Sequence, residues 1–336
     1  MQNNKQHKKI IKITIIGFPI IVILLSLFIG RYPLDPAQII DVLFSPSTYI
    51  GDNAYSIVFN IRIPRIIVGL LVGGILAASG AGLQGMFKNP LVDSGMLGVS
   101  SGASFGAVLG IIIFNNNYSI TILFAFLFGL IAVFSSYLIA RTYKSSPRLM
   151  LVLSGLIVSS LFSSLVAMGK FVADPFDQLP TIVFWLMGSI ANVGYQEVLY
   201  IIIPIGISII GLSMMGWRIN VLSMGDRDAH SLGVSPNFTK VIVIILCSLG
   251  TAAAVSVVGT IGWVGLVIPH ITRMLLGSDN KTLIPYSFLL GAGFLAAIDI
   301  VARTATSAEL PIGMLTSFIG APFYIFLLRK TKGGGW

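Results

Sequence analysis

The sequence contains little charge. Only 10% of its 336 residues are Asp, Glu, Lys or Arg, whereas 55% are hydrophobic, and the mean hydropathy is +0.94. A soluble chain carries about 25% charged residues. The shortage of charge excludes an ordinary soluble domain and indicates a polytopic membrane protein. The net charge of +9 does not indicate a nucleic-acid partner, because the basic residues are scattered at the ends of apolar segments.

Residues that carry chemistry are also scarce. Cys247, the one cysteine, lies in an apolar run, which excludes a disulfide framework and a CxxC metal or redox motif. The sequence has no HExxH, no GxSxG, no paired carboxylates and no haem-ligating pair of histidines, so we expect no catalytic residue, metal site or cofactor in this chain. The nearest approach to a phosphate-binding loop, "GAGLQGMF" at 80–87, has Met86 where the lysine should stand. The chain is therefore not expected to be an enzyme, and energy for uphill transport would have to come from another subunit.

Long apolar runs are abundant. A window of about 20 apolar residues predicts an all-α membrane protein with ten transmembrane helices in a single domain, 1–336. The predicted spans are 11–30, 64–85, 95–114, 119–140, 149–168, 196–217, 239–258, 263–276, 282–301 and 310–328. The first follows the basic stretch "MQNNKQHKKIIK" and precedes no A-x-A-like cleavage site, so it is interpreted as an uncleaved span rather than a signal peptide.

Lysine and arginine predict the orientation of these spans. All but five of the 21 basic residues fall on one face of the predicted topology, and the exceptions are Arg31, Arg62, Arg65, Lys170 and Arg303. The positive-inside rule makes the first face cytoplasmic. Both termini are therefore expected in the cytoplasm, as a basic tail at 1–12 and a second tail at 330–336.

Ionisable groups are almost absent from the predicted span interiors. Asp93, Glu197 and Asp299 fall near span ends, and His270 follows Pro269 near the inner end of the eighth span. Proton-coupled and many sodium-coupled transporters need carboxylates or histidines at membrane depth. Coupling to an ion gradient is therefore not expected.

The fifth span is rich in hydroxyl groups. Its serines are Ser154, Ser159, Ser160, Ser163 and Ser164. They could face a wetted translocation path, or they could bond back to the carbonyl four residues earlier. The sequence leaves both interpretations open.

The longest cytoplasmic segment, 218–240, predicts two short helices. Asp226 is a candidate N-cap, Gly233 a stop signal, and Ser235 followed by Pro236 a second helix start. A folded pair of helices that protrudes from a membrane bundle offers a docking surface to another protein. The alternative is a structured loop that only covers the bundle.

The stretch "IRIPR" at 61–65 places two arginines on the predicted external face. Arginine presents a planar fork to carboxylates, Pro64 restrains the backbone, and complementary charge steers encounter with a partner. Arg62 and Arg65 could therefore dock an external protein, or they could extend to lipid headgroups. Arg303 could simply pair with Asp299, four residues earlier.

Several stretches together resemble the FecCD family, the permease subunits of ABC importers for iron–siderophores, haem and cobalamin. The matching stretches are "IRIPR" (61–65), "GGILAASGAGLQGMFKNPLVDSGMLGVSSGA" (73–103), "WLMGS" (185–189), "NVLSMGDRDAHSLGV" (220–234), "GTIGWVGLVIPHITRMLLG" (259–277), "DIVAR" (299–303) and "ELPIGMLTSFIGAPFYIFLLRK" (309–330). These stretches occur in the same order along the chain as in members of the family. One departure is "NPLVDSG", where many members carry a proline after the acidic or polar position.

The resemblance implies a set of partners in a bacterial cytoplasmic membrane. These are a second permease subunit, identical or paralogous, two cytoplasmic ATPase subunits that use ATP, an extracytoplasmic substrate-binding protein and the lipid bilayer. Cytoplasmic loop 218–238 would contain the coupling helices that contact the ATPase, and the matching residues are Gly225, Asp226, Ala229, Leu232 and Gly233. Arg62, Arg65 and Arg303 would pair with glutamates of the binding protein, and the fifth and tenth spans would line the path.

The expected function is that of a permease subunit that moves cargo by alternating access. A ferric siderophore is the first candidate cargo, because it is the most frequent cargo in the family that the sequence resembles. Haem and cobalamin are the alternatives. Two competing functions are a facilitator or secondary transporter that works without an ATPase and a membrane scaffold that transports nothing.

Overall fold

The structure is a computed structural model that describes residues 2–142 and 147–330, and every regular element in them is helical. The helices are α1 (Gln2–Phe28), α2 (Pro36–Phe44), α3 (Asn53–Tyr55), α4 (Ile63–Phe87), α5 (Val99–Ile113), α6 (Tyr118–Thr142), α7 (Pro147–Val172), α8 (Gln178–Met187), α9 (Tyr195–Leu222), α10 (Asp226–Ser231), α11 (Pro236–Val258), α12 (Val264–Leu276), α13 (Asn280–Thr304) and α14 (Ile312–Lys330). A π-helical segment, Ser56–Arg62, leads into α4, and 3₁₀ turns occupy Pro46–Tyr49 and Ser94–Leu97.

The all-α prediction is confirmed, and each of the ten predicted spans falls on a helix. Within the described residues, seven helices are long and apolar enough to cross a membrane, whereas α5, α8, α12 and α14 are shorter apolar helices. The count of ten crossings therefore stays a prediction. The spans did not include α8, because its ten residues are too few to register in a window of about 20.

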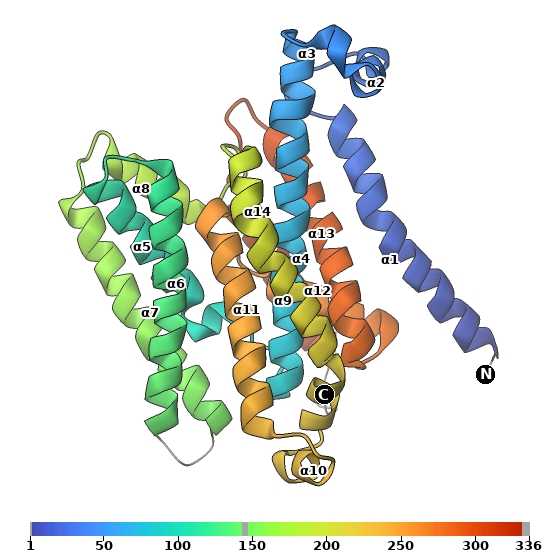
Figure 1. Cartoon of the computed structure of the whole chain (residues 1–336), viewed down its shortest axis with the longest axis vertical. Helices are drawn as coiled ribbons and strands as arrows, with labels where there is room; N and C mark the ends of the chain where they lie inside the picture. Colours follow the sequence, from blue (N-terminus) through green and yellow to red (C-terminus); the bar gives the residue numbers. More distant parts are fainter. Residues whose placement is uncertain (1, 143–146, 331–336) are drawn as a thin grey trace.

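The two ends of the molecule differ. The first residues of α1 and the last residues of α14 lie toward the end that carries α10, while α2 and α3 occupy the opposite end (Figure 1). The side of the membrane that each end faces stays a prediction. The expected basic tail begins inside α1 rather than preceding it, and residues 331–336 of the second tail lie outside the described residues.

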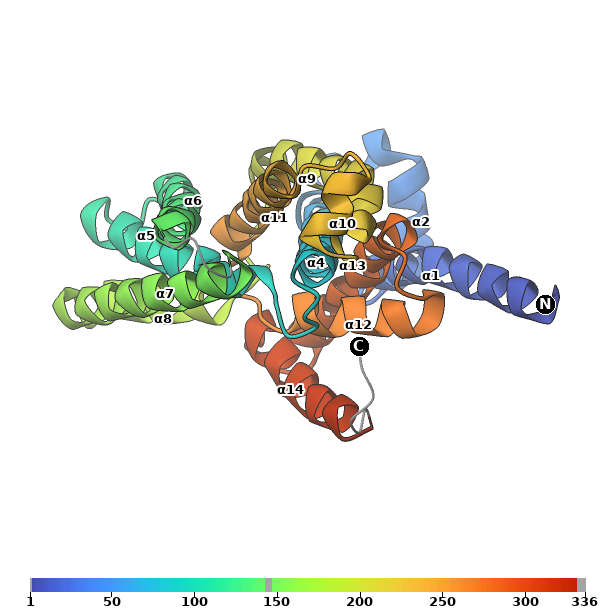
Figure 2. The ribbon, with the colours of Figure 1, turned by 90° about the horizontal axis from the view of Figure 1, so that it is seen from below.

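Helix α4 forms the centre of the bundle. Seen along the bundle, α9 and α11 lie on one side of α4 and α12 and α14 on the other (Figure 2). Glycine permits this close packing. A Cβ at Gly73 would overlap the carbonyl oxygen of Gly291 in α13, and a Cβ at Gly80 would overlap that of Gly265 in α12. Close backbone contact of this kind stabilises helix pairs where lipid removes the hydrophobic incentive to associate.

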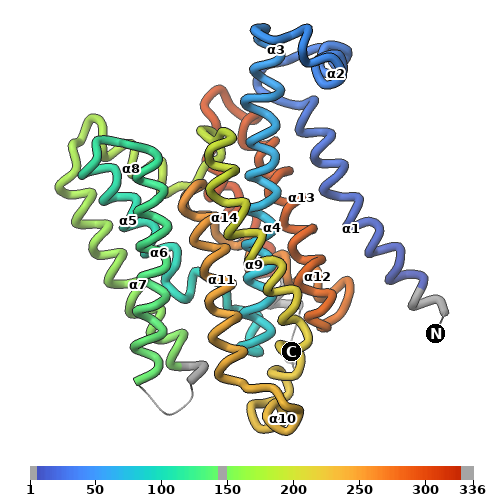
Figure 3. The backbone as a smooth tube through the Cα atoms, viewed as in Figure 1, coloured from blue at the N-terminus to red at the C-terminus, as the bar shows by residue number. Residues whose placement is uncertain are grey.

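Two groups of helices flank this centre. Helices α5, α6 and α7 pack on one another and join the centre mainly through contacts of α6 and α5 with α11. On the opposite side, α1 diverges from the bundle toward its N-terminal end (Figure 3). Most contacts of α1 are with α13, and much of its apolar surface faces outward. Contacts of α1 with α13 extend along the helix, since Lys12 lies over the ring of Tyr286 and Phe18 lies against Gly293.

Candidate functional site

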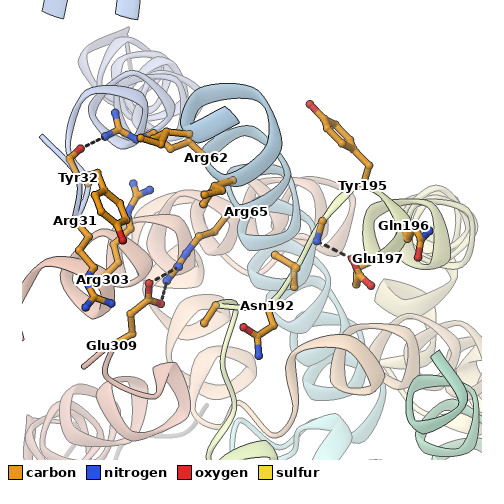
Figure 4. Close-up of a pocket in the computed structure, with 16 residues that line it drawn as sticks. Arg31, Tyr32, Arg62, Arg65, Asn192, Tyr195, Gln196, Glu197, Arg303 and Glu309 are labelled. Carbon is orange, nitrogen blue, oxygen red and sulfur yellow. Dashed lines mark hydrogen bonds and ion pairs between the residues drawn. The ribbon is translucent and has the colours of Figure 1, made fainter. Parts of the chain in front are cut away.

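A pocket of about 610 Å³ lies near the α2–α3 end and brings together the three predicted docking arginines. Arg62 comes from the π-helical segment, Arg65 from the first turn of α4 and Arg303 from the last turn of α13. Figure 4 shows Arg65 pointing to Glu309 in the segment before α14, while Arg62 points to Tyr32. The fold therefore gathers residues that lie far apart in the sequence.

Arg65 is already paired with two carboxylates. Its side chain is almost entirely buried, with the residue 3% exposed. The Nε atom donates to both oxygens of Asp299, at 2.8 and 3.0 Å. The two Nη atoms contact the carboxylate of Glu309, at 3.0 and 2.7 Å. This arrangement links α4, α13 and the start of α14.

Arg303 makes its closest contacts with α1. The sequence offered Asp299 as its partner, and that ion pair is present but long, with 3.8 Å between Nε and Oδ2. The Nη2 atom of Arg303 donates to the backbone carbonyl of Ser26 at 2.8 Å and to the Ser26 hydroxyl. Arg303 therefore connects the end of α13 to the last turn of α1.

Arg62 also binds the end of α1. It is 2% exposed, and it donates to the carbonyls of Leu27 and Tyr32, the latter at 2.7 Å. Gly30 makes room for it, because a Cβ there would lie 2.8 Å from Nη2 of Arg62. The guanidinium of Arg62 therefore packs directly against the backbone of Gly30, which has no side chain.

Together, Arg62 and Arg303 cap the C-terminus of α1 by donating hydrogen bonds to its last carbonyl groups. The last carbonyls of a helix lack intrahelical donors, and cations are favourable there. The carbonyl of Leu25 is satisfied by Ile29 N–H, and the next two are satisfied by Arg303 and Arg62. Sequence analysis missed this role, although Gly30 directly after the apolar run of α1 is a signal of a helix end.

The pocket carries a small net positive charge. Four arginines (Arg31, Arg62, Arg65 and Arg303) and two glutamates (Glu197 and Glu309) line it, so positive charges exceed negative ones by two. The guanidinium groups of Arg62, Arg65 and Arg303 already have partners within the chain. The exposed fraction of the Glu309 side chain exceeds that of Asp299. Docking of an external protein stays a prediction. To bind these arginines, a carboxylate of that protein must compete with the partners that they already have within the chain.

The predicted coupling residues form one compact turn. Between α9 and α11, the structure has a single short helix, α10, rather than two, because Pro236 starts the long helix α11 directly. The N-cap is Gly225 instead of Asp226, whose carboxylate contacts Lys240 in α11 at 2.6 Å. Gly225 and Gly233 have φ angles of 141° and 76°, which favour glycine.

A small apolar core holds α10 in place. Ala229 is buried with Val221 of α9 and Val234 before α11. Leu232 follows α10 and is 52% exposed, and Met224 just before it is exposed too. The turn is therefore a rigid projection with apolar side chains on its surface. Its contact with an ATPase stays a prediction.

The serines of α7 do not share one environment. Ser154 is buried and its hydroxyl donates to the carbonyl of Met150 at 2.6 Å, and Ser164 donates to that of Ser160 at 3.0 Å. The back-bonding interpretation therefore holds for these two donors. Ser160, Ser163 and Ser164 are exposed, and Ser159 is half-buried. Their role in lining a path stays a prediction.

Comparison with known proteins agrees with these features. Residues 18–330 match the FecCD transport family. The chain is 40% identical to the molybdate import system permease protein MolB of Haemophilus influenzae, over 94% of each chain. It is also 40% identical to a probable iron chelatin transport system permease protein of Helicobacter pylori, over 82% of this chain and 83% of that one.

A solved structure has the same fold. It is described as an inward-facing conformation of a metal-chelate type ABC transporter, and its chain superposes with a TM-score of 0.84 at 38% identity. The superposition covers 95% of this chain and 99% of the other. The helical bundle, the family match and the extent of these similarities lead to one conclusion. This chain belongs to the FecCD transport family, as a permease component of an ABC transporter.

Proposed function

We propose that this chain is the membrane subunit of an ATP-driven importer in a bacterial cytoplasmic membrane. A second permease subunit, two ATPase subunits and an extracytoplasmic binding protein would complete the complex. The observation that carries this proposal is the α10 turn, because it has its own core and yet exposes Leu232 and Met224. Exposed apolar side chains on a rigid projection suit a protein partner.

The α10 turn would transmit the work of ATP. Its glycines at both ends fix tight turns, and the contact between Asp226 and Lys240 ties it to α11. A push on α10 would therefore be passed to α9 and α11 rather than absorbed by a flexible loop. Such rigid-body movement is a common means of alternating access.

The binding protein would sit over the arginine-lined pocket. Its carboxylates would displace Glu309 from Arg65, since the Glu309 side chain is the more accessible of the two internal partners. Arg62 and Arg303 would meanwhile keep α1 in place. This arrangement would join docking to the start of α14, which begins at Ile312, three residues after Glu309.

The cargo class is a metal-containing solute. Relatives are named for molybdate, iron chelatin, cobalamin and hemin. A ferric siderophore is our first candidate, and molybdate is the second because the similarity to MolB spans 94% of both chains. Haem and cobalamin follow.

Coupling through α10 can be tested with two matched substitutions. Leu232→Glu adds a charge to the exposed surface of the turn, whereas Ile50→Glu adds the same charge to a residue that is 73% exposed at the opposite end. The chain would be co-expressed with the ATPase subunit of its transporter and purified in detergent. Leu232→Glu should lower the amount of bound ATPase at least tenfold, and Ile50→Glu should leave it unchanged. Equal ATPase recovery with both variants would refute coupling through α10.

A further inference from the structure

The stripe of α1 that packs on α13 changes its chemical character along the helix. Between residues 6 and 28, the buried residues of α1 are Ile15, Pro19, Val22 and Ser26. Spacings of three and four positions keep side chains on one helix face. The same spacing continues toward the N-terminus to Lys12 and then to Lys8. The stripe therefore ends in two lysines.

The first of these lysines shows which way the stripe faces. Lys12 is half-buried, and its Nζ atom lies 5.6 Å from the centre of the Tyr286 ring in α13. A cation over an aromatic ring is attracted to it. Lys8 lies one turn further along and is exposed, and α1 diverges from the bundle toward this end (Figure 3). Lys8 therefore lies on the α13 side of α1 without being covered by α13.

The length of α1 places both lysines at a membrane boundary. The helix rises about 30 Å from Lys8 to its last residue, Phe28, and the hydrocarbon core of a bilayer is about 30 Å thick. Tyr286 beside Lys12 agrees with this position, because tyrosines gather at the interface between membrane and water. With Phe28 at one boundary, Lys8 and Lys12 reach the level of the lipid phosphates at the other.

Protein carboxylates do not neutralise these lysines. Residues 1–34 contain no Asp or Glu. Within the part of the chain that the structure describes, no ion pair involves Lys8 or Lys12. The facing start of α13 carries Asp279 and Lys281, whose charges cancel, and Asp279 already accepts a hydrogen bond from the N–H of Lys281 at 3.0 Å. The positive charge at this end of α1 therefore remains without a protein partner.

We propose that Lys8 and Lys12 bind the phosphate of one anionic phospholipid, held at the membrane boundary between the N-terminal end of α1 and α13. Basic residues clustered beside a membrane span attract anionic lipids. The acyl chains would follow the outward apolar surface of α1, where Ile13 is 60% exposed. The lipid would hold the divergent end of α1, as Arg62 and Arg303 hold the opposite end. The site goes beyond the proposed transport function, because it depends on neither the cargo nor the ATPase.

Two double substitutions test the site with an equal loss of charge. Lys8→Gln with Lys12→Gln removes both lysines of the stripe. Lys9→Gln with Lys88→Gln is the control, because both residues are exposed and lie outside the stripe. The full chain would be purified in dodecyl maltoside, and its affinity for single lipids would be measured by native mass spectrometry. The probes are dioleoyl phosphatidylglycerol, which is anionic, and dioleoyl phosphatidylcholine, which has the same acyl chains and a phosphate but no net charge.

The unaltered protein should bind phosphatidylglycerol about tenfold more tightly than phosphatidylcholine. Loss of Lys8 and Lys12 should weaken phosphatidylglycerol binding about tenfold, whereas the control should weaken it less than about twofold. Affinity for phosphatidylcholine should be the same in all three proteins. Equal losses in the two variants would show a response to total charge alone and would overturn the proposal. Equal affinity of the unaltered protein for the two lipids would also overturn it.

Lys8→Arg with Lys12→Arg separates charge from packing. Arginine keeps the positive charge and a similar reach, so phosphatidylglycerol affinity should stay within about twofold of that of the unaltered protein. A loss as large as that of the glutamine variant would show that the contact of Lys12 with Tyr286 matters rather than the charge, and it would contradict the site.

Hydrogen exchange tests whether the lipid holds α1. Exchange at the N-terminal turns of α1 should be about threefold slower in phosphatidylglycerol nanodiscs than in phosphatidylcholine nanodiscs, and Lys8→Gln with Lys12→Gln should remove this difference. Equal exchange by the unaltered protein in the two lipids would contradict the proposed role of the lipid.

Discussion

Replacing Arg65 with methionine tests whether the arginine cluster is a structural element. The substitution keeps most of the side-chain length and removes the charge that faces Asp299 at 2.8 and 3.0 Å. Asp299 would then be buried with Arg303 as its one remaining cation in the cluster, at 3.8 Å. At an effective dielectric constant of about 20, charges 4 Å apart interact by about 4 kcal/mol. Removing one partner of a buried pair costs about 3–5 kcal/mol, so we expect a loss of that size.

A double-mutant cycle isolates the pair. Replacing both members by apolar residues, as in Arg65→Met with Asp299→Leu, removes the stranded charge and should cost about 2 kcal/mol less than the sum of the two single changes. Arg31→Met is the control, since Arg31 lines the same pocket and is exposed, and its effect should stay within about 0.5 kcal/mol.

The assay is reversible unfolding in mixed detergent micelles, followed by circular dichroism. The reasoning would be refuted if Arg65→Met unfolded like the unaltered protein. In that case Arg65 would not be committed to internal partners and would be free to dock an external protein without competition.

Three further predictions follow from the packing. Arg62→Gln should increase hydrogen exchange at the C-terminal end of α1, because the carbonyl of Leu27 loses a charged donor worth about 1.5–3 kcal/mol; unchanged exchange would contradict the capping role. Gly30→Ala should cause a similar increase by displacing the guanidinium of Arg62, and an effect confined to the mutated residue would contradict the close fit. Gly73→Ala should lower the free energy of unfolding by about 1–3 kcal/mol, because its Cβ overlaps the carbonyl of Gly291; a denaturation midpoint equal to that of the unaltered protein would show that α4 and α13 can separate freely.

Hydropathy predicted the positions of the long helices well, but it did not predict every shorter apolar helix. Long apolar runs produced a helix at each predicted span, since a helix satisfies its own backbone hydrogen bonds in lipid. The short helix α8 could not be found in this way, because its length is half of the search window. The break before α12 was predicted, because one span ends at 258 and the next begins at 263, but the positive φ of Trp263, 70°, has no hydropathy signal.

The sequence predicted which arginines form the cluster, but it did not predict their hydrogen-bond and ion-pair partners. The motif resemblance selected Arg62, Arg65 and Arg303, and the fold brings them to one pocket. The one local pairing in the sequence, Asp299 with Arg303, is the longest ion pair of the group. The closer partners of Arg65 lie 234 and 244 residues away, and pairing over such separations depends on tertiary packing rather than on local spacing.

Local sequence signals predicted where the chain turns around α10. Glycine and proline in the sequence predicted where the chain turns, because Gly233 occupies the left-handed region and Pro236 opens α11. The predicted cap was one residue late, since Asp226 pairs with Lys240 across the turn. Ala229 becomes buried through contacts with α9 and with the segment before α11, which no local pattern encodes.

The most direct test is solute accumulation in sealed vesicles that contain this chain and the ATPase subunit of its transporter. With the binding protein outside and ATP inside, a labelled ferric siderophore or molybdate should accumulate against its gradient, and an ATPase variant without its phosphate-binding lysine should abolish accumulation. Uphill accumulation by vesicles that contain this chain alone would contradict a permease that depends on a separate ATPase.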